Sequence, residues 1–589
     1  MSFLAMPPIK IMRYGKMRDL YDYSTLSAYN DAEATYYDRL HSEKYRDKGQ
    51  TFAEHASNIA AKIASNATHR ATIYSSIINR RFLPAGRFQA AMGAKDREVS
   101  PFNCSVSQKI CDSMDSIMEA LHRAALILRL GTGIGFNFSH LRPTGTQIRK
   151  LGTQSTGPLL FMKMYDVMAS TIASAGHRRG AMMGIMNVDH PDIEKFIDAK
   201  MEKGAYRQFN LSVGVTDEFM DAVRGDRDWP LRFNGQVYNV VKARYLWERI
   251  MHNAYDSAEP GILFIDRFNS ANNLWYCEHI EATNPCSEQP LPPNGLCLLG
   301  SFNLPRYLTP KREINYAQLR EDIHATVEGY DNIFEDAIYA VPEHKDEAVS
   351  KRRMGLGFTG IANAIELMLD RPSYGDDRFC AVLDSVSGFL KNAAYQSSTF
   401  LARDRGSFPL FKKEEFLESK FSQSLDVSTR NLINTYGIRN SHLISYAPCG
   451  TISQCAGNVS SGVEPVFFYN VNRKVHMRDG LEEVELQDYN VKYHKFYGKT
   501  LEQCSIEDHL NVARVIQQHT DSAVSKTVNV ASSCSFEEYE NVYMEAYNSG
   551  LKGITVFRPT ELRGAVIVEA KPSEGNALHC AITGECTAE

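Results

Sequence analysis

The chain lacks the paired cysteine spacings that hold structural metals. Its twelve cysteines are scattered, and none forms a C-x-x-C pair. Structural zinc sites usually carry such pairs, so the sequence predicts no metal ligands. Scattered thiols also do not make the disulfide framework of a small secreted domain. We therefore expect these cysteines to be buried or redox-active in a reducing compartment.

A basic excess, a signal peptide and long apolar runs are also missing. The formal net charge is -5, whereas proteins that coat nucleic acids usually carry a basic surplus. Met1–Lys10 lacks the apolar core of a secretion signal, and no run approaches the roughly 18 apolar residues of a membrane span. These absences predict a cytoplasmic protein, or one of the host cytoplasm if viral, that contacts neither membrane nor nucleic acid and handles at most small nucleotides.

Composition divides the 589 residues into three predicted regions. Residues 1–85 are polar, contain helical-looking stretches, and predict a small helical N-terminal region. Residues 86–563 alternate apolar runs with amphipathic segments, which is typical of an α/β domain with parallel strands. Residues 564–589 predict a mobile tail. The predicted strands include Gly261–Ile265, Leu443–Tyr446 and Gly553–Phe557, and the predicted helices include Ser113–Leu128, His190–Lys200 and His509–Gln517.

The most informative segment is Asn284–Glu288, which places an amide, a thiol and a carboxylate at alternate positions. In an extended segment, Asn284, Cys286 and Glu288 would line one face. Of these three side chains, only cysteine is of a type that is often fully buried in a protein core. The trio therefore predicts a site where a hydrogen-bond donor, a sulfur redox centre and a base meet one small molecule.

Three glycine-containing segments could contact phosphate groups. Gly131–Gly135 lacks both the P-loop Lys-Ser/Thr and full G-x-G-x-x-G spacing, so a tight turn between helix and strand is an equal alternative. Ala175–Ala181 places two arginines between glycines and could bind phosphate or a base, or form a solvated loop. Pro448–Ser453 follows a predicted strand and suits a backbone N–H cradle, or a simple turn.

Taken together, the chain from about Phe82 to Arg558 closely resembles the catalytic subunit of ribonucleotide reductase. The resemblance implies a ten-stranded α/β barrel of two parallel five-stranded halves with a central finger loop. The motifs that carry it are Asn284–Glu288, Leu296–Gly300, Arg353–Gly357, Ala447–Ser453, Ser461–Pro465, Ser525–Asn529, and His177–Ala181 with Val188–Ile193.

The resemblance implies a role for each residue of the trio. Cys286 would be the thiyl radical that takes the 3′ hydrogen of a ribonucleotide, Glu288 the general base on the 3′ hydroxyl, and Asn284 the group that holds the ribose hydroxyls. Cys104 and Cys297 would deliver two reducing equivalents and close into a disulfide, which requires two thiols close in space.

The C-terminal cysteines Cys580 and Cys586 match the family's shuttle pair, which thioredoxin or glutaredoxin would recharge. Two thiols on a flexible tether have a high effective concentration at an internal site, which supports the same interpretation independently. The alternative is a chance pair at a disordered end.

The resemblance further implies binding sites for substrate and effector. The substrate phosphate would lie against Pro448, Cys449, Gly450, Thr451, Ile452 and Ser453, where Cys449 departs from the hydroxyl residue common in the family. A deoxynucleoside triphosphate effector at the interface of a homodimer would contact Asp112, Ser113, Arg142, Gly176, Arg178, Arg179 and Gly180. Such an effector couples two sites through a free-energy link. The short N-terminal region shows no ATP-binding cone.

Thr555 and Val556 indicate the source of the radical, because they stand where oxygen-dependent members of the family carry two adjacent tyrosines. This favours adenosylcobalamin as cofactor. The alternative is an oxygen-dependent enzyme that uses a separate metal-containing small subunit. Tyr543 and Tyr547 lie nearby, but a four-residue spacing is more typical of one helix face than of a redox relay. Gly584 lacks the surroundings of a glycyl radical.

The sequence argues against two other function classes. A regulatory paralogue would be expected to lose Cys286, Glu288 or the tail cysteines, and all are present. An acyl transferase like pyruvate formate-lyase would want adjacent active-site cysteines, and the chain has no Cys-Cys dipeptide. The sequence therefore favours a ribonucleotide reductase. The dimeric cobalamin-dependent forms that it resembles favour diphosphate substrates, but the sequence itself leaves diphosphates and triphosphates as alternatives.

Overall fold

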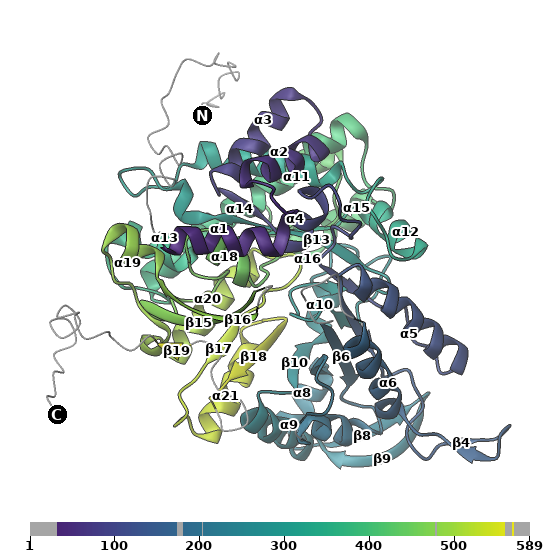
Figure 1. The fold of residues 1–589 in the computed structure, drawn as a ribbon. Helices are drawn as coiled ribbons and strands as arrows, with labels where there is room; N and C mark the ends of the chain where they lie inside the picture. Colours follow the sequence, from purple (N-terminus) through teal and green to yellow (C-terminus); the bar gives the residue numbers. More distant parts are fainter. Residues whose placement is uncertain (1–31, 173–180, 203, 478–479, 560–567, 570–589) are drawn as a thin grey trace, which may run out of the picture.

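The structure is a computed structural model that describes residues 32–172, 181–202, 204–477, 480–559 and 568–569 (Figure 1). Among these residues, no helix is long and apolar enough to cross a membrane. The helices are α1 (Ala32–Tyr45), α2 (Phe52–Ile63), α3 (Ala67–Ile78), α4 (Gly86–Met92), α5 (Met114–Arg129), α6 (Pro158–Thr171), α7 (Ile193–Ile197), α8 (Asp217–Arg224), α9 (Ala243–Ser257), α10 (Ile265–Ser270), α11 (Tyr316–Asp331), α12 (Pro342–Lys351), α13 (Ile361–Leu369), α14 (Asp377–Arg405), α15 (Lys413–Glu418), α16 (Lys420–Gln423), α17 (Val427–Tyr436), α18 (Gly450–Cys455), α19 (Tyr489–His494), α20 (Ile506–Gln518) and α21 (Phe536–Asn548).

Five parallel strands form the first half of a barrel. Their spatial order is β2 (Cys104–Val106), β3 (Gly133–Asn137), β6 (Met182–Asn187), β7 (Phe209–Val215) and β10 (Gly261–Phe264), each hydrogen-bonded to the next. These strands are buried on both faces because helices cover the outside and the barrel interior is filled. α5, α6, α8 and α9 lie around this half in Figure 1.

The second half is also parallel and closes the barrel. β13 (Leu296–Asn303) pairs with β14 (Met354–Thr359), which meets the segment 443–446 through the Leu356–Ile444 bridge. That segment bridges to Val524 just before β17 (Thr527–Asn529), which pairs with β18 (Gly553–Phe557). The halves join antiparallel, β13 to β2 and β18 to β10. The predicted ten-stranded barrel of two five-stranded halves is confirmed.

A short hairpin lies inside this barrel, and we call residues 282–291 the finger hairpin. Its strands are β11 (Ala282–Thr283) and β12 (Pro290–Leu291), paired antiparallel. Ala282 and Leu291 pack with Met183, Ile185 and Leu263 from the inner face of the first half. The hairpin therefore carries its tip to the centre of the barrel.

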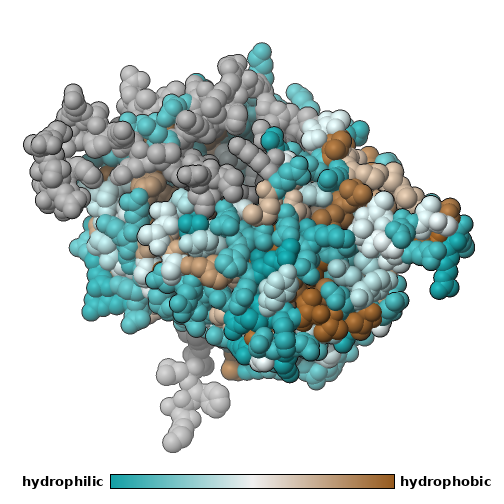
Figure 2. All heavy atoms as spheres, turned by 90° about the horizontal axis from the view of Figure 1, so that it is seen from below, coloured by the Kyte–Doolittle hydropathy of each residue, from teal (hydrophilic) through white to brown (hydrophobic). Residues whose placement is uncertain are grey.

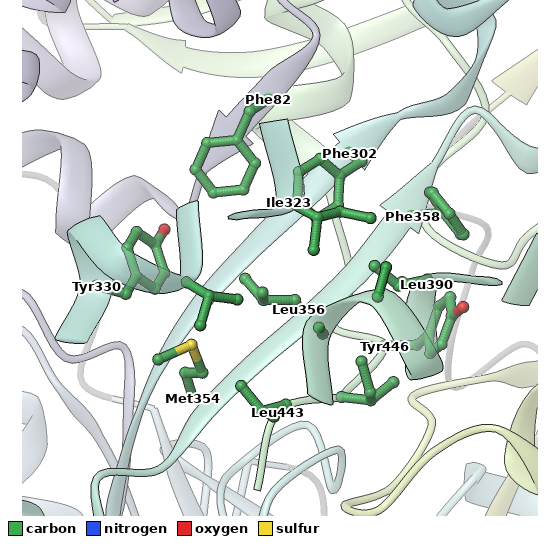
Figure 3. Packing of buried hydrophobic residues seen from close by; sticks show 14 of the residues in the cluster. Phe82, Phe302, Ile323, Tyr330, Met354, Leu356, Phe358, Leu390, Leu443 and Tyr446 are labelled. Atoms are coloured by element: carbon green, nitrogen blue, oxygen red, sulfur yellow. The ribbon is translucent and has the colours of Figure 1, made fainter. Parts of the chain in front are cut away.

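The largest core cluster lies between the outer face of the second half and the helices that cover it. Side chains alternate along β13, so Leu298 and Phe302 join this outer core while Cys297 and Leu299 face the barrel interior. Figure 3 shows Phe302 beside Phe358 and Leu356 of β14, with Tyr330 of α11 close by. The N-terminal helices α2 and α3 pack into the same cluster.

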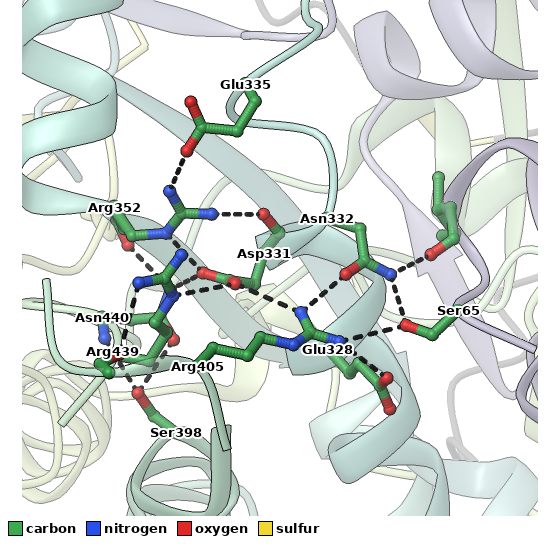
Figure 4. Close-up of polar contacts among 12 residues, drawn as sticks. Ser65, Glu328, Asp331, Asn332, Glu335, Arg352, Ser398, Arg405, Arg439 and Asn440 are labelled. Carbon is green, nitrogen blue, oxygen red and sulfur yellow. Dashed lines mark hydrogen bonds and ion pairs between the residues drawn. The ribbon is translucent and has the colours of Figure 1, made fainter. Parts of the chain in front are cut away.

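A buried carboxylate fixes the start of β14. Asp331, at the end of α11, accepts a hydrogen bond from Arg352 Nε at 2.7 Å and from Asn440 Nδ2 at 3.0 Å (Figure 4). Arg405 and Arg439 add ion pairs at 3.4 and 3.2 Å. Because Arg352 precedes β14 and Asn440 precedes the 443–446 segment, this network holds two neighbouring barrel strands in register.

The predicted elements compare well with those observed. Helices were predicted at Ser113–Leu128 and His509–Gln517, and these are confirmed as α5 and α20. In His190–Lys200, only the five-residue α7 and a 3-10 turn at Asp198–Lys200 form. The remaining strands are β1 (Phe82–Pro84), β4 (Gln147–Ile148), β5 (Thr153–Gln154), β8 (Asp228–Phe233), β9 (Gln236–Lys242), β15 (Asn470–Met477), β16 (Gly480–Gln487) and β19 (Val568–Glu569).

Candidate active site

The tip of the finger hairpin holds the predicted trio in a turn. Asn284 N donates to Gln289 O at 3.1 Å, Gln289 N donates to Asn284 Oδ1 at 2.9 Å, and Ser287 has a left-handed φ of 66°. The prediction of an extended segment is therefore wrong. The turn leaves Cys286 partly exposed at the apex, whereas Asn284 and Glu288 are buried below it.

Gly135 of β3 makes room for the hairpin. A Cβ added at Gly135 would lie 1.7 Å from the carbonyl oxygen of Thr283, at the base of the hairpin. The cluster Gly131–Gly135 thus forms the predicted turn and strand start: Gly131 follows α5 with a φ of 85°, and Gly133 begins β3. Its role here is close approach of two backbones.

Both halves of the barrel hold the hairpin tip. Asn210 Nδ2 of β7 donates to Pro285 O at 2.8 Å. From the second half, Ala523 N and Ser445 Oγ donate to Glu288 O at 3.0 and 2.9 Å. The sequence analysis assigned no role to Asn210 or Ser445. Each is a polar residue within a mostly apolar strand segment, which is a weak signal on its own.

Cys104 and Cys297 face each other across a strand ladder. Cys104 of β2 is the register partner of Cys297 of β13, and both side chains are buried free thiols in one cluster. Directly opposed residues of an antiparallel pair have Cα atoms about 4.5–5.5 Å apart. That spacing falls within the range of roughly 4.4–6.8 Å that a disulfide needs. The two thiols are therefore placed to form one.

Cys104 also contacts the trio directly. Asn284 Nδ2 donates to Cys104 Sγ at 3.0 Å, and Cys104 Sγ donates to Glu288 Oε1 at 3.6 Å. Burial, followed by the negative charges of Glu288, Cys286 and Cys297, raises the pKa of Cys104 well above its usual value. Burial likewise raises the pKa of Cys297. Both thiols are held protonated, and all five predicted catalytic residues of the barrel meet here.

A cavity of about 980 Å³ opens beside Cys286. Its volume is at the upper end of the roughly 300–1000 Å³ typical of small-molecule sites. Cys286 and Ser287 line it from the hairpin, Pro448 from the predicted phosphate segment, and Thr555 from β18. Cys286 is thus the member of the trio that faces open space.

Two motifs without an assigned role also reach this cavity. Glu464 and Lys526, from Ser461–Pro465 and Ser525–Asn529, both line it. Lys526 Nζ lies 2.5 Å from Glu464 Oε2 and 2.7 Å from His509 Nδ1. Burial and then the charge of Lys526 lower the pKa of His509 to about 2, so that ring is neutral. Both motifs are among those that resemble the family, and this resemblance was the signal in the sequence that could have identified Glu464 and Lys526.

The predicted phosphate cradle is the first turn of α18. Cys449 is its N-cap, and helix residues begin at Gly450, where an added Cβ would meet nothing within 4 Å. First-turn N–H groups have no intrahelical acceptors. Cys449 is buried with its Sγ 3.1 Å from Ser301 Oγ, while Ser453 Oγ donates to Gly450 O at 3.0 Å. Pro448 and Gly450 are exposed, and Thr451 is partly exposed.

Part of the predicted effector set comes together at one end of α5. Arg142 Nε donates to Asp112 Oδ2 at 2.7 Å, and Arg142 N donates to Asp112 Oδ1 at 3.2 Å. Ser113 caps α5 by accepting from Ser116 N. The remaining predicted residues lie outside the described part of the chain: Gly176, Arg178, Arg179 and Gly180 of the effector set, and the tail cysteines Cys580 and Cys586.

The tyrosines near β18 lie on the far side of that strand from the cavity. Thr555 is exposed toward the cavity, whereas Val556 is fully buried. Tyr543 OH accepts from Val556 N at 3.3 Å, and burial raises the pKa of Tyr543 to about 12. Tyr543 and Tyr547 are both buried on α21, so their predicted placement on one helix face is confirmed.

The chain is similar to known proteins over the whole barrel. Residues 102–557 match the family described as "Ribonucleotide reductase, barrel domain". A "Vitamin B12-dependent ribonucleoside-diphosphate reductase" of Mycobacterium tuberculosis (strain CDC 1551 / Oshkosh) is 33% identical over 493 residues, or 78% of this chain and 68% of the relative. A protein of the same name from Thermoplasma acidophilum is 33% identical over 478 residues, 76% of this chain and 60% of the relative. The "Ribonucleoside-diphosphate reductase subunit alpha" of Chlamydia pneumoniae is 24% identical over 572 residues, 82% of this chain and 54% of the relative.

Proposed function

This chain belongs to the ribonucleotide reductase family, and from that premise we propose that it reduces ribonucleoside diphosphates to deoxyribonucleotides. One observation carries the proposal. Cys104 is the ladder partner of Cys297 and at the same time hydrogen-bonds with Asn284 and Glu288. A dithiol, an amide and a carboxylate thus meet beneath the partly exposed Cys286.

Cys286 starts the reaction as a thiyl radical and takes the hydrogen atom from C3′ of the ribose. Its place at the apex of the hairpin lets it reach a substrate in the cavity. Glu288 accepts the proton of the 3′ hydroxyl group, and Asn284 donates a hydrogen bond to the ribose hydroxyls. Asn284 and Glu288 lie below the apex and do not line the cavity, so the ribose hydroxyls must reach past Cys286 to come within the roughly 2.6–3.2 Å that proton transfer to Glu288 requires.

Cys104 and Cys297 then supply the two electrons. The C2′–O bond breaks and the hydroxyl leaves as water with the hydrogen of one thiol. The hydrogen of the other thiol goes to C2′, the two sulfurs join as a disulfide, and Glu288 returns its proton to the 3′ oxygen. One C–O bond is thereby exchanged for a C–H bond at C2′, and Cys286 regains its radical when the hydrogen returns to C3′. The raised pKa of Cys104 keeps its hydrogen available for this transfer. Cys580 and Cys586 reduce the disulfide again and are recharged by thioredoxin or glutaredoxin.

The first turn of α18 holds the substrate's phosphates through its backbone N–H groups. Cys449 does not weaken this role, because backbone donors need no particular side chain. Pro448, at the cavity wall, links this turn to the space beside Cys286.

Adenosylcobalamin is the proposed radical source; when bound, it oxidises Cys286. The cavity of about 980 Å³ beside Cys286 is bounded in part by small residues, among them Gly261 of β10, Thr555 of β18 and Ser532, and these leave space at this wall for part of such a large group. Thr555 stands at the surface where an oxygen-dependent enzyme would need a phenol. The names of the Mycobacterium tuberculosis and Thermoplasma acidophilum relatives, which describe them as vitamin B12-dependent, support the same choice.

A homodimer with an effector site is proposed at α5 and α6. Both helices expose apolar side chains, among them Met114 at 59% and Val167 at 64%. Viewed from below, the largely hydrophilic surface carries brown apolar groups mainly on its right side (Figure 2). The Arg142–Asp112 pair at the end of α5 would hold a deoxynucleoside triphosphate together with Gly176–Gly180.

The decisive assay is reduction of ribonucleoside diphosphates with dithiothreitol, with and without adenosylcobalamin. Wild-type protein should turn over with the cofactor, Cys286→Ser should not, and the exposed-thiol control Cys277→Ser should match wild type. Turnover that appears only with a ferritin-like partner protein would refute the cobalamin assignment. Turnover with neither addition would refute both radical sources.

A further inference from the structure

A second pocket lies away from Cys286, where the chain leaves β13. It has a volume of about 360 Å³ and lies among the 3-10 helix Leu304–Tyr307, the start of α11, the end of α13 and α19. Figure 1 shows α13 and α19 together at the left of the molecule. This volume is within the range of small-ligand sites.

Cationic side chains converge on this pocket. Arg81, Arg306, Arg312 and His494 line it, and none of the described residues that line it is acidic. Partial burial, then the guanidinium charges of Arg312 and Arg306, lower the pKa of His494. Arg306 and Arg312 are therefore close enough to the imidazole to disfavour its protonation, so positive charge is concentrated at this pocket.

Arg81 and Arg312 each contact a carboxylate that is not part of the pocket lining. Arg81 pairs with Asp322 at 2.7 Å, and Asp322 is fully buried behind it. Arg312 pairs with Asp370, but their side chains are 43% and 75% exposed. Exposed pairs contribute little, so Arg312 can turn to a ligand at small cost.

The remaining lining supplies orientation and hydrogen bonds. Arg306 lies over the ring of Tyr489 at 5.6 Å, a contact that holds the plane of its guanidinium group. Asn79 and Thr309 add polar groups to the wall. Planar guanidinium groups in fixed orientation are suited to bidentate contact with phosphate oxygens.

We propose that this pocket binds a small phosphate-bearing anion, either a free polyphosphate or the phosphate chain of a nucleotide. A bound ligand would affect the position of the substrate cradle, because Tyr489 packs with Cys449 and Ile452 in one apolar cluster. The pocket also follows directly on β13, the strand that carries Cys297. Occupancy thus acts on the proposed reductase through the position of α18.

Calorimetric titration of the full chain with pyrophosphate, tripolyphosphate and ATP tests the site without requiring turnover. Arg306→Gln and Arg312→Gln should each weaken binding by roughly tenfold or more, the loss typical of hydrogen bonds to a charged group. Arg403→Gln, which removes an exposed arginine paired with its neighbour Asp404, should bind as wild type does. Tighter binding of tripolyphosphate than ATP identifies a free polyphosphate, and the reverse identifies a nucleotide.

The ring of His494 gives a second readout. Pyrophosphate should raise its pKa in an NMR titration of wild type, because a bound anion offsets the two arginines. That shift should be absent in Arg306→Gln. Polyphosphate binding that survives both arginine substitutions belongs to another site and overturns the proposal, as does a His494 pKa that pyrophosphate leaves unchanged. Both results are independent of whether the chain reduces ribonucleotides.

Discussion

Replacement of Gly135 by alanine tests how the finger hairpin is positioned. The added Cβ would lie 1.7 Å from Thr283 O and 2.9 Å from Thr283 C. Both are backbone atoms at the base of the hairpin, so no side-chain rotation relieves the overlap. Because close carbon–oxygen contacts lie at roughly 3.3–3.6 Å, the hairpin must retreat from β3 by about 1.5 Å or more.

That retreat moves Asn284, Cys286 and Glu288 away from Cys104. Misplacement by about 1 Å can lower a rate by roughly 100-fold, so dithiothreitol-driven turnover of Gly135→Ala should fall at least that far. Overpacking should also lower the free energy of unfolding by about 1–3 kcal/mol in urea titrations. Disulfide formation between Cys104 and Cys297 under mild oxidation should persist, since neither cysteine lies on the hairpin.

Gly388→Ala is the matched control. Gly388 lies within α14, and its added Cβ would meet His519 at 3.4 Å, an ordinary contact. Alanine in a helix interior is favoured over glycine by roughly 0.5–1 kcal/mol. Gly388→Ala should therefore keep turnover and stability. If Gly135→Ala reduces substrate at the wild-type rate, the hairpin does not position the catalytic residues as described.

The tail cysteines, a buried carboxyl group and the exposed apolar face each give a further prediction. Cys580→Ser with Cys586→Ser should spare dithiothreitol-driven turnover and abolish thioredoxin-driven turnover; equal loss with both reductants would contradict the shuttle. Burial raises the pKa of Glu366 from 4.5 to about 7, so the wild type loses stability as pH rises through that window. As pH rises through this window, the free energy of unfolding of Glu366→Gln, measured in urea, should increase relative to that of wild type by up to roughly 3 kcal/mol. A difference between the two proteins that does not change with pH would refute this. Val167→Glu should yield monomers in light scattering, whereas Val427→Glu, equally 64% exposed, should not.

The barrel's strands could be predicted from the sequence because each is a short apolar run. Gly261–Ile265 and Gly553–Phe557 became β10 and β18 almost residue for residue. The segment 443–446 joins the sheet through isolated bridges, yet its apolar pattern was enough to predict it as a strand. Closure of the ring depends on pairing between distant runs, and no local pattern encodes that pairing.

The site was predicted in its members but not in its geometry. Asn284, Cys286 and Glu288 were found through alternation, yet a left-handed Ser287 bends the segment into a turn. Cys104 and Cys297 were paired by resemblance alone, since only the β2–β13 register brings them together. The cationic pocket at Arg306 could not be predicted, because its side chains come from four separate stretches of sequence.

The β2–β13 seam gives the reductant pair a mechanical consequence. Cys104 belongs to one half of the barrel and Cys297 to the other, and the halves meet only along this seam and the β10–β18 seam among the described strands. Each turnover would therefore link the two halves covalently through the Cys104–Cys297 disulfide. A cross-link that closes so long a loop restricts the unfolded chain by about 5 kcal/mol in the chain-entropy model. The oxidised enzyme would therefore be more stable than the reduced enzyme. Each reduction by the tail would remove this cross-link between the two halves as well as restore the two thiols.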